Sequence, residues 1–351
     1  MTAGGFFKTS GHTAAGHFRR LTTGSKEILP GLCFTGAVAA LAFALHQIPA
    51  LSMLSPMILA IVIGVGIKNI VGTPACVKAG VAFSLRRILR VAIILLGLQL
   101  TAAQVIAVGA TGVAVIISTI FATFVFTTVM GRVLGVGPKL TQLIAAGTSI
   151  CGVSAVVATN TVTHACDEDV SYAVACITVF GSLSMLLYPA LPALLHLDPR
   201  AFGLWTGASI HEIAQVIGAS FQEGQVAGEF GAVSKLTRVM MLAPVVLTLG
   251  MLAARRVGQI SDNQKTRIQM PLFIVGFLAV VAINSVITIP PETRTWIVAI
   301  NTFLLSIALA AMGLETDIFK LTAKGIRPLA LGAAATLFIS FFSLILVKMT
   351  F

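Results

Sequence analysis

Long apolar runs, separated by short clusters of charged residues, prolines and glycines, set the pattern of this chain. Each run is long enough to cross the hydrocarbon core of a bilayer as an α-helix, which takes about 20 residues. The pattern therefore predicts an all-α polytopic membrane protein with about eleven transmembrane helices. The predicted spans are residues 31–47, 54–71, 85–104, 106–130, 141–162, 170–195, 203–221, 235–254, 270–289, 296–316 and 328–350.

Composition supports this class and excludes several others. Of the 351 residues, 57% are hydrophobic and only 10% are charged, whereas a soluble domain carries roughly 25% charged residues. This excludes a soluble enzyme, a secreted disulfide module and a disordered chain. The formal charge of +11 comes with only two Trp and two Tyr, and the basic residues flank the apolar runs, so we expect no nucleic-acid partner. The five cysteines have no metal-ligand spacing, and we expect neither a metal nor a cofactor.

The basic residues predict the orientation of the spans. With the N-terminus in the cytoplasm and strict alternation, nineteen of the 23 Lys and Arg fall inside, Arg200 among them. The acidic turn 167–169 falls outside, and so does the C-terminus. Residues 1–30 have no apolar core of a signal peptide and are expected to form a cytoplasmic tail, with residues 31–351 as the transmembrane domain. The protein is therefore expected to be a multi-pass membrane protein with its N-terminus in the cytoplasm.

Three polar or glycine-rich stretches interrupt the apolar runs: residues 147–154, 207–212 and 301–317. Irregular backbone at membrane depth is tolerated only where it is buried in protein or lines a cavity. Where a helix is broken, the free N–H groups of the new N-terminus can bind an anion, so each stretch is a candidate binding site. The alternative is close helix packing through small residues four apart, such as Gly203 and Gly207. Both interpretations stay open for each stretch.

Ionisable residues inside the spans are the candidates for chemistry. His211 and Glu212 lie in the seventh span, where a charge is costly, and either could carry a proton during transport. The alternative is that both are hydrated near the end of the span. Lys235 and Arg238 begin the eighth span, and Arg238 could reach the headgroups or attract an anion.

The order of spans also predicts an internal repeat. With the first span set aside, residues 54–195 and 203–350 would form two inverted five-helix repeats, which pairs the polar fifth span with the polar tenth.

Several blocks of sequence resemble a known family. LPGL (29–32), AAGTSICGVSAVVAT (145–159), FGLWTGASIHEIAQV (202–216), KLTRVMMLAP (235–244) and MGLETD (312–317) are similar to the bacterial sulfate exporter family of conserved hypothetical membrane proteins. That family looks like a member of the cation-proton antiporter and anion transporter superfamily. The resemblance implies inverted repeats, two broken helices that cross near the membrane centre, a core that moves against a scaffold, and commonly a homodimer. By position, the crossing pair would be spans five and ten, with span seven contributing His211.

The sequence thus predicts a secondary transporter of a small inorganic anion such as sulfate or sulfite, which works by alternating access. Transport could be coupled to protons or to sodium, and the sequence does not choose between them. The alternatives are a cation/proton antiporter, an organic-anion symporter and an intramembrane enzyme that uses Ser149 or Ser209 with His211. A receptor or structural role is a further alternative. We expect no enzyme, because Ser209 and His211 point to different faces of a regular helix. The predicted substrate-binding residues are Thr148, Ser149, Cys151, Gly152, Ser154, Ser209 and Asn301, and the predicted proton-coupling residues are His211 and Glu212.

Overall fold

The computed structural model describes residues 13–49, 51–52, 54–106, 108–242, 245, 272–287, 289–322 and 324–350. These residues form helices joined by short connections, with no strand among them, so the predicted all-α class is confirmed. The basic loop predicted near residues 255–267 lies outside the described residues. The long helices are α1 (Thr13–His46), α2 (Pro56–Ile70), α6 (Gly109–Val133), α9 (Asp167–Leu187), α13 (Gln225–Met240), α15 (Leu272–Val286), α16 (Pro291–Glu315) and α17 (Ile326–Thr350).

The remaining helices are shorter. A run from residue 78 to 99 joins α3 (Lys78–Phe83), the π-helical turn η2 (Ser84–Ile88), α4 (Leu89–Leu96) and η3 (Gly97–Gln99). The others are η1 (Ala75–Val77), α5 (Ala102–Ile106), α7 (Pro138–Ser149), α8 (Val153–Thr163), η4 (Tyr188–Ala190), α10 (Pro192–Leu195), α11 (Pro199–Ser209), α12 (Ile213–Ser220), η5 (Phe221–Glu223) and η6 (Phe319–Thr322).

Five helical segments of the described chain are long and apolar enough to cross a membrane. They are Glu27–His46, Gly109–Val133, Asp167–Ala190, Glu292–Glu315 and Ile326–Thr350. Helix α1 begins at Thr13 and therefore includes residues 13–30 of the predicted tail.

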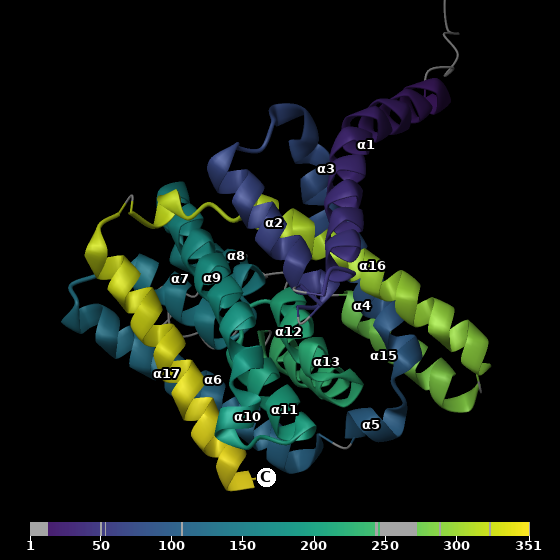
Figure 1. Ribbon diagram of the computed structural model, residues 1–351. Coiled ribbons are helices and arrows are strands. Elements are labelled where there is room, and N and C mark those ends of the chain that lie inside the picture. The colour runs from purple at the N-terminus through teal and green to yellow at the C-terminus, as the bar shows by residue number, and fades with distance from the viewer. Residues whose placement is uncertain are drawn as a thin grey trace, which may run out of the picture.

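The helices gather into two groups, seen side by side in Figure 1. We call α1–α4, α15 and α16 the α16 body, and α6–α13 with α17 the hairpin body. In the α16 body, α2 and α16 approach closely, because a Cβ atom on Gly64 would lie only 2.5 Å from the carbonyl oxygen of Ala310. In the hairpin body, the rings of Phe126 and Phe338 stack with centroids 4.0 Å apart and join α6 to α17.

The fifth predicted span is a helical hairpin. Helix α7 ends at Ser149, and α8 begins at Val153 after a break in the backbone. The Nζ of Lys139, at the start of α7, donates a hydrogen bond to the carbonyl oxygen of His164, just after α8, at 2.8 Å. The chain therefore enters and leaves the hairpin body on the same side, and the prediction that this span crosses the membrane is wrong.

This hairpin changes the predicted sides of the following loops. The ammonium of Lys324, before α17, donates a hydrogen bond to the carboxylate of Asp169 in the first turn of α9, and this bond raises the pKa of Lys324. The acidic turn thus lies on the same side as Lys324, although the sequence placed the two on opposite sides. Because α9 then runs across the body, Arg200 at the start of α11 lies on the side opposite to Lys324, although the sequence placed both on the cytoplasmic side.

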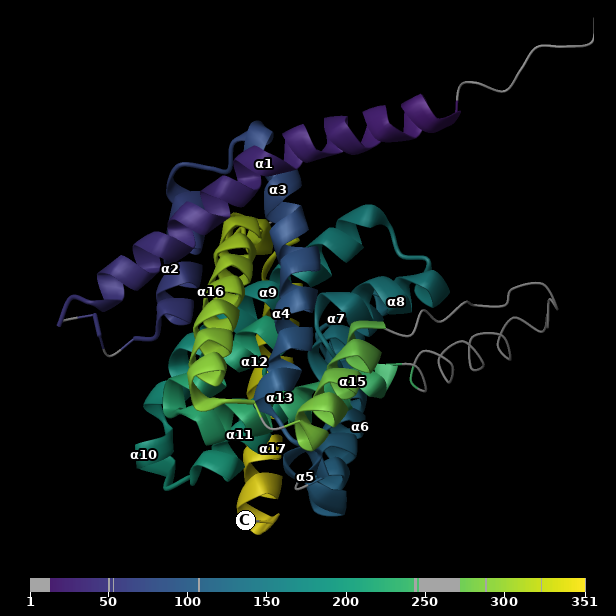
Figure 2. The ribbon, with the colours of Figure 1, turned by 90° about the vertical axis from the view of Figure 1, so that its right-hand side faces the viewer.

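The seventh predicted span is a second hairpin. Helix α11 ends at Ser209 and α12 begins at Ile213. The hydroxyl oxygens of Thr206, in the last turn of α11, and Ser220, at the end of α12, lie 3.1 Å apart, so α12 folds back along α11. This hairpin enters from the side on which α9 ends, whereas the first enters from the side on which α9 begins (Figure 2).

Helix α13 packs closely against α11. A Cβ on Gly203 would lie 2.5 Å from the carbonyl oxygen of Ala227, and one on Gly207 would lie 2.5 Å from the Cβ of Ser234. These pairs advance together along both helices, so α13 runs parallel to α11. Close packing through Gly203 and Gly207 is confirmed, in addition to the break that follows them.

Candidate functional site

The tips of the two hairpins, residues 150–152 and 210–212, meet inside the hairpin body. Gly152 adopts φ +72° and ψ −133°, a conformation that favours glycine, and Ile210 is extended. Each tip therefore exposes two helix ends, a C-terminus with unpaired carbonyls and an N-terminus with unpaired N–H groups.

Two basic residues of α13 cap both C-termini. Lys235 donates to the carbonyl oxygens of Ile150 at 3.2 Å and Ile210 at 2.8 Å. Arg238, one turn further, donates to Ser149 O at 2.8 Å and to Ile210 O at 2.9 Å, and its second terminal nitrogen donates to Thr148 O. Both side chains are fully buried. Cations at helix C-termini oppose the negative end of the helix dipole, so α13 holds the two hairpins together through charge.

The carboxylate of Glu212 caps both N-termini. Its Oε1 accepts a hydrogen bond from the backbone N–H of Val153, the first residue of α8, at 2.5 Å. The same side chain accepts from the backbone of Gln215 in the first turn of α12, while the Gln215 side chain accepts from the Glu212 N–H at 3.0 Å. A Cβ on Gly152 would collide with this carboxylate, so the glycine also makes room for it. One carboxylate thus occupies the positive ends of two helices.

His211 lies beside Glu212, 1% exposed. Its Nε2 is 3.5 Å from the hydroxyl oxygen of Thr336 in α17, and its Nδ1 has no hydrogen-bond partner. Because the Thr336 hydroxyl donates to Gly332 O at 2.8 Å, it can only accept from the ring, which leaves Nδ1 of a neutral imidazole as an unpaired acceptor. His211 therefore presents an unpaired ring nitrogen beside the crossing.

The structure brings most of the predicted site residues to this crossing. Thr148, Ser149, Cys151 and Gly152 form the first tip, and Ser209 precedes the second. The hydroxyls of Ser149 and Ser209 donate to the carbonyl oxygens of Ala145 and Trp205 in their own helices, both at 2.6 Å, so neither hydrogen points to a ligand. At Thr148 and Ser149 it is the main-chain carbonyls, not the hydroxyls, that enter the charged cluster.

Ser154 differs from the other tip residues because it is exposed, on the first turn of α8. Glu212, beside it, is only half-buried. The N-terminal side of the crossing is therefore less buried than the C-terminal side, where Arg238 and Lys235 have no exposed surface.

Asn301 lies apart from the crossing. It is a residue of α16, which runs without interruption from Pro291 to Glu315. The prediction that spans five and ten form the broken pair is therefore wrong, and span seven takes the place of span ten. The polar residues of α16 do not break it because Thr302 and Ser306 bond to carbonyls within the helix, both at 2.8 Å.

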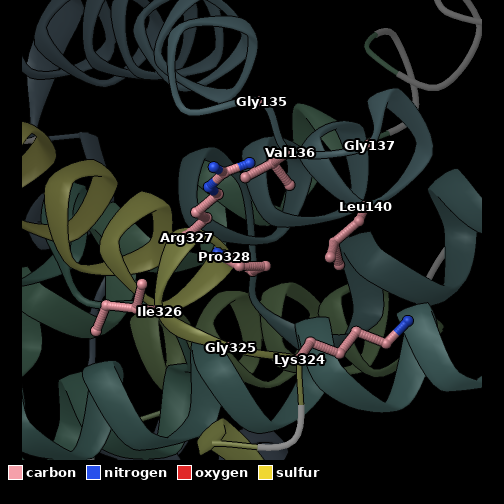
Figure 3. A pocket seen from close by; sticks show the side chains of 9 residues that line it. All are labelled: Gly135, Val136, Gly137, Leu140, Lys324, Gly325, Ile326, Arg327 and Pro328. Atoms are coloured by element: carbon pink, nitrogen blue, oxygen red, sulfur yellow. The ribbon is translucent and has the colours of Figure 1, made fainter.

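A pocket of about 520 Å³ in the described part of the chain is also remote from the tips (Figure 3). It lies where α7 and α17 begin, and the side chain of Arg327 extends there toward Gly135. None of the predicted site residues lines it.

Sequence reasoning did not assign Lys235 and Arg238 to the site. A signal for them was present in the sequence. The two basic residues, three apart, begin an apolar run on the predicted outer side of the membrane, where Lys and Arg are uncommon. In their ordinary charge states, two cations and one carboxylate leave an excess of one positive charge at the crossing. The arrangement can hold a negatively charged group at helix N-termini and has one spare positive charge to balance it.

The described apolar helices and the paired hairpins with a buried charged crossing define a polytopic membrane protein. The chain belongs to the family Conserved hypothetical protein 698, whose model matches residues 30–332.

Three relatives have similar lengths. UPF0324 membrane protein PA5383 of Pseudomonas aeruginosa is 37% identical over 320 residues, which cover 88% of this chain and 90% of that one. A UPF0324 membrane protein of Corynebacterium glutamicum is 35% identical over 320 residues, with 91% and 92% covered. UPF0324 inner membrane protein YeiH of Escherichia coli K12 is 35% identical over 314 residues, with 86% and 88% covered. No solved structure matches the chain.

Proposed function

We propose that this protein is a secondary transporter of a small inorganic anion in the bacterial inner membrane, with proton coupling through Glu212. The observation that carries the proposal is the position of the Glu212 carboxylate, which accepts hydrogen bonds at the N-termini of both α8 and α12. The inner-membrane location follows the name of the relative YeiH.

Two broken hairpins at membrane depth favour transport over a structural role. Bilayer proteins satisfy backbone groups within continuous helices, and irregular backbone is retained mainly at binding sites and translocation paths. Here the hairpins enter from opposite sides and meet at their tips, so a solute held at the tips could be reached from either side after a rearrangement of the bodies. This is the geometry that alternating access requires.

The site chemistry favours an anion over a cation. The N–H groups that bind the Glu212 carboxylate could equally bind an oxyanion such as sulfate or sulfite, because both present oxygen acceptors with negative charge. The excess positive charge from Lys235 and Arg238 opposes the entry of a cation. Ser154, exposed beside the N-terminus of α8, could donate a further hydrogen bond.

Proton coupling would follow from competition between the Glu212 carboxylate and the substrate anion for the same N–H groups. Glu212 and the substrate would use the same N–H groups, so the anion binds well only when Glu212 is protonated or withdrawn. One proton would then accompany each anion, and His211 could pass that proton through its unpaired Nδ1. We propose a carrier rather than an enzyme because the Ser209 hydroxyl donates to Trp205 O and the His211 ring lies against Thr336.

The decisive experiment is anion binding and flux by purified protein across pH. Sulfate, sulfite, thiosulfate and bicarbonate would be tested by thermal stabilisation in detergent and by flux into proteoliposomes. Anion affinity should rise as the pH falls, by up to about tenfold per pH unit for one coupled proton. In Glu212→Gln the amide oxygen can accept these N–H bonds when no anion is present, so the protein should fold. Because the amide is neutral at every pH, as a protonated Glu212 would be, an anion should displace it with a flat pH dependence.

Glu168→Gln, at an exposed carboxylate on the acidic turn, is the control and should retain the pH dependence. If no anion stabilises the wild-type protein or crosses the liposome membrane at any pH, the proposed function is refuted. If Glu212→Gln retains the wild-type pH dependence, Glu212 is not the coupling group.

A further inference from the structure

Asn301 is a buried amide without partners. Its side chain on α16 is 1% exposed, and neither its nitrogen nor its oxygen has a hydrogen bond. An amide offers two donors and an acceptor with two lone pairs, and leaving these unpaired in the interior is unfavourable. The neighbours Thr302 and Ser306 satisfy their hydroxyls within the same helix. Asn301 is therefore distinct from ordinary polar residues of this helix.

The amide lines a small cavity between the two bodies. The cavity has a volume of about 30 Å³, enough for one or two water molecules and too small for an oxyanion such as sulfate. From the α16 body it is lined by Met57, Leu96, Gln99, Val298, Asn301, Thr302 and Leu305, and from the hairpin body by Phe221 and Gln225.

Hydrogen bonds join the two bodies beside this cavity. Gln225 Nε2, in the first turn of α13, donates to Gln99 Oε1 at 3.3 Å and to Glu229 Oε1 at 2.7 Å. Nearby, the backbone N–H of Ser55 donates to Gln222 Oε1 at 2.6 Å. The contacts lie at the side where α2, α13 and α16 begin, which is the predicted outer side. A few amide contacts are weak enough to be exchanged for water when the bodies separate.

The seam between the two bodies continues from the cavity to α12. Asn301 lies seven residues deeper in α16 than Arg294, which donates to Gln99 O at 3.3 Å, and this corresponds to about 10 Å along the helix axis. Two turns further, Leu309 touches α12, since a Cβ on Gly218 would lie 3.5 Å from its Cδ1. Helix α12 carries Glu212 at its N-terminus. The cavity and the proposed anion site therefore lie along one seam between the bodies.

We propose that this cavity is the closed outer end of the substrate path, that the Gln99–Gln225 contact is its gate, and that Asn301 is a substrate contact exposed when the gate opens. The proposal rests on the proposed function. It explains why a buried amide is kept without partners, because its donors are used only when the path is open. A neutral amide can hydrogen-bond an anion without holding it as firmly as a fixed positive charge would.

Asn301→Leu tests the substrate contact. Leucine has nearly the same shape and removes the unpaired groups, so the melting temperature of the purified protein should equal or exceed that of the wild type, while anion flux should fall at least tenfold. The control is Ser306→Ala on the same helix, a buried hydroxyl that bonds within α16 and should leave flux unchanged. Unchanged flux in Asn301→Leu would overturn the role of Asn301 as a substrate contact. A lowered melting temperature would overturn it too, because it would identify Asn301 as a hydrated amide that stabilises the fold.

Cross-linking tests the gate independently. In a variant with the five native cysteines replaced, and shown to transport, Gln99→Cys with Gln225→Cys would be joined by a short bifunctional thiol reagent. Flux should fall at least tenfold and return on reduction. The control pair is Asp169→Cys with Lys324→Cys, which join α9 to the segment before α17 within the hairpin body and should permit flux when linked. Full flux in the linked Gln99/Gln225 pair would overturn the gate. A wild-type protein that moves no anion would instead refute the proposed function.

Discussion

Glu212 accepts a hydrogen bond from the backbone N–H of Val153 at 2.5 Å, across 59 residues of sequence. This contact joins the tips of two hairpins that enter from opposite sides, and it puts a carboxylate where two helix dipoles end. The relationship also explains why Gly152 has no side chain, since a methyl group there would meet the carboxylate.

Replacing Arg238 should destabilise the protein more than any surface change. Arg238→Met would leave the buried carbonyls of Thr148 and Ser149 without the donors from Arg238, and the Ile210 carbonyl with Lys235 alone, at a cost of about 3 kcal/mol or more. Thermal denaturation in detergent would measure this. Arg90→Met, at an exposed position on α4, is the matched change and should cost less than about 0.5 kcal/mol. Equal melting temperatures for both variants would contradict the capping role.

Gly152→Ala should also destabilise the crossing. The residue has φ +72°, and the new methyl group would displace Glu212, so we expect a loss of about 1–3 kcal/mol and a loss of anion binding. Gly137→Ala is the control, because Gly137 has a negative φ and open space around its Cβ direction. A Gly152→Ala variant as stable as the wild type would mean that the tip can rearrange freely.

The hairpin fold of α7 and α8 predicts a specific labelling pattern. Cysteines introduced at Glu168 and Lys324 should react with an impermeant thiol reagent from the same side, and one at Arg200 should react from the other. If the start of α1 is cytoplasmic, the fold places position 200 outside, and it alone of the three would be labelled in intact cells. Labelling of positions 168 and 324 from different sides would refute the hairpin.

His211→Gln should change the pH dependence of anion flux, because it removes the buried imidazole whose Nδ1 is free to accept a proton. Thr336→Val removes only the hydroxyl next to Nε2 and should preserve the profile. Superimposable flux profiles for His211→Gln and the wild type would exclude His211 from the proton path.

Local sequence is sufficient to locate both breaks. Glycines and polar residues distinguish the stretches 147–154 and 207–212, and the structure breaks at 150–152 and 210–212. The same reasoning fails at Asn301, because polar residues spaced along α16 can satisfy themselves within a helix, and no local signal distinguishes that outcome from a break.

Topology and the charged cluster could not be predicted from local sequence. A hairpin and a crossing helix have the same apolar length, so hydropathy cannot tell them apart, and only the Lys139–His164 contact does so. Likewise, the position of Lys235 against Ile150 and Ile210 depends on how three helices pack. Long continuous helices such as α6 and α17 were predicted to within a few residues. A helix in lipid is apolar on all sides, so its ends follow from hydropathy alone and do not depend on which face packs against protein.

Each hairpin returns the chain to the side from which it came. A segment of this kind adds no net passage, so its insertion or deletion would leave every later helix facing the way it did before. The tip regions could therefore be remodelled during evolution without inverting the rest of the molecule, which single spanning helices do not allow.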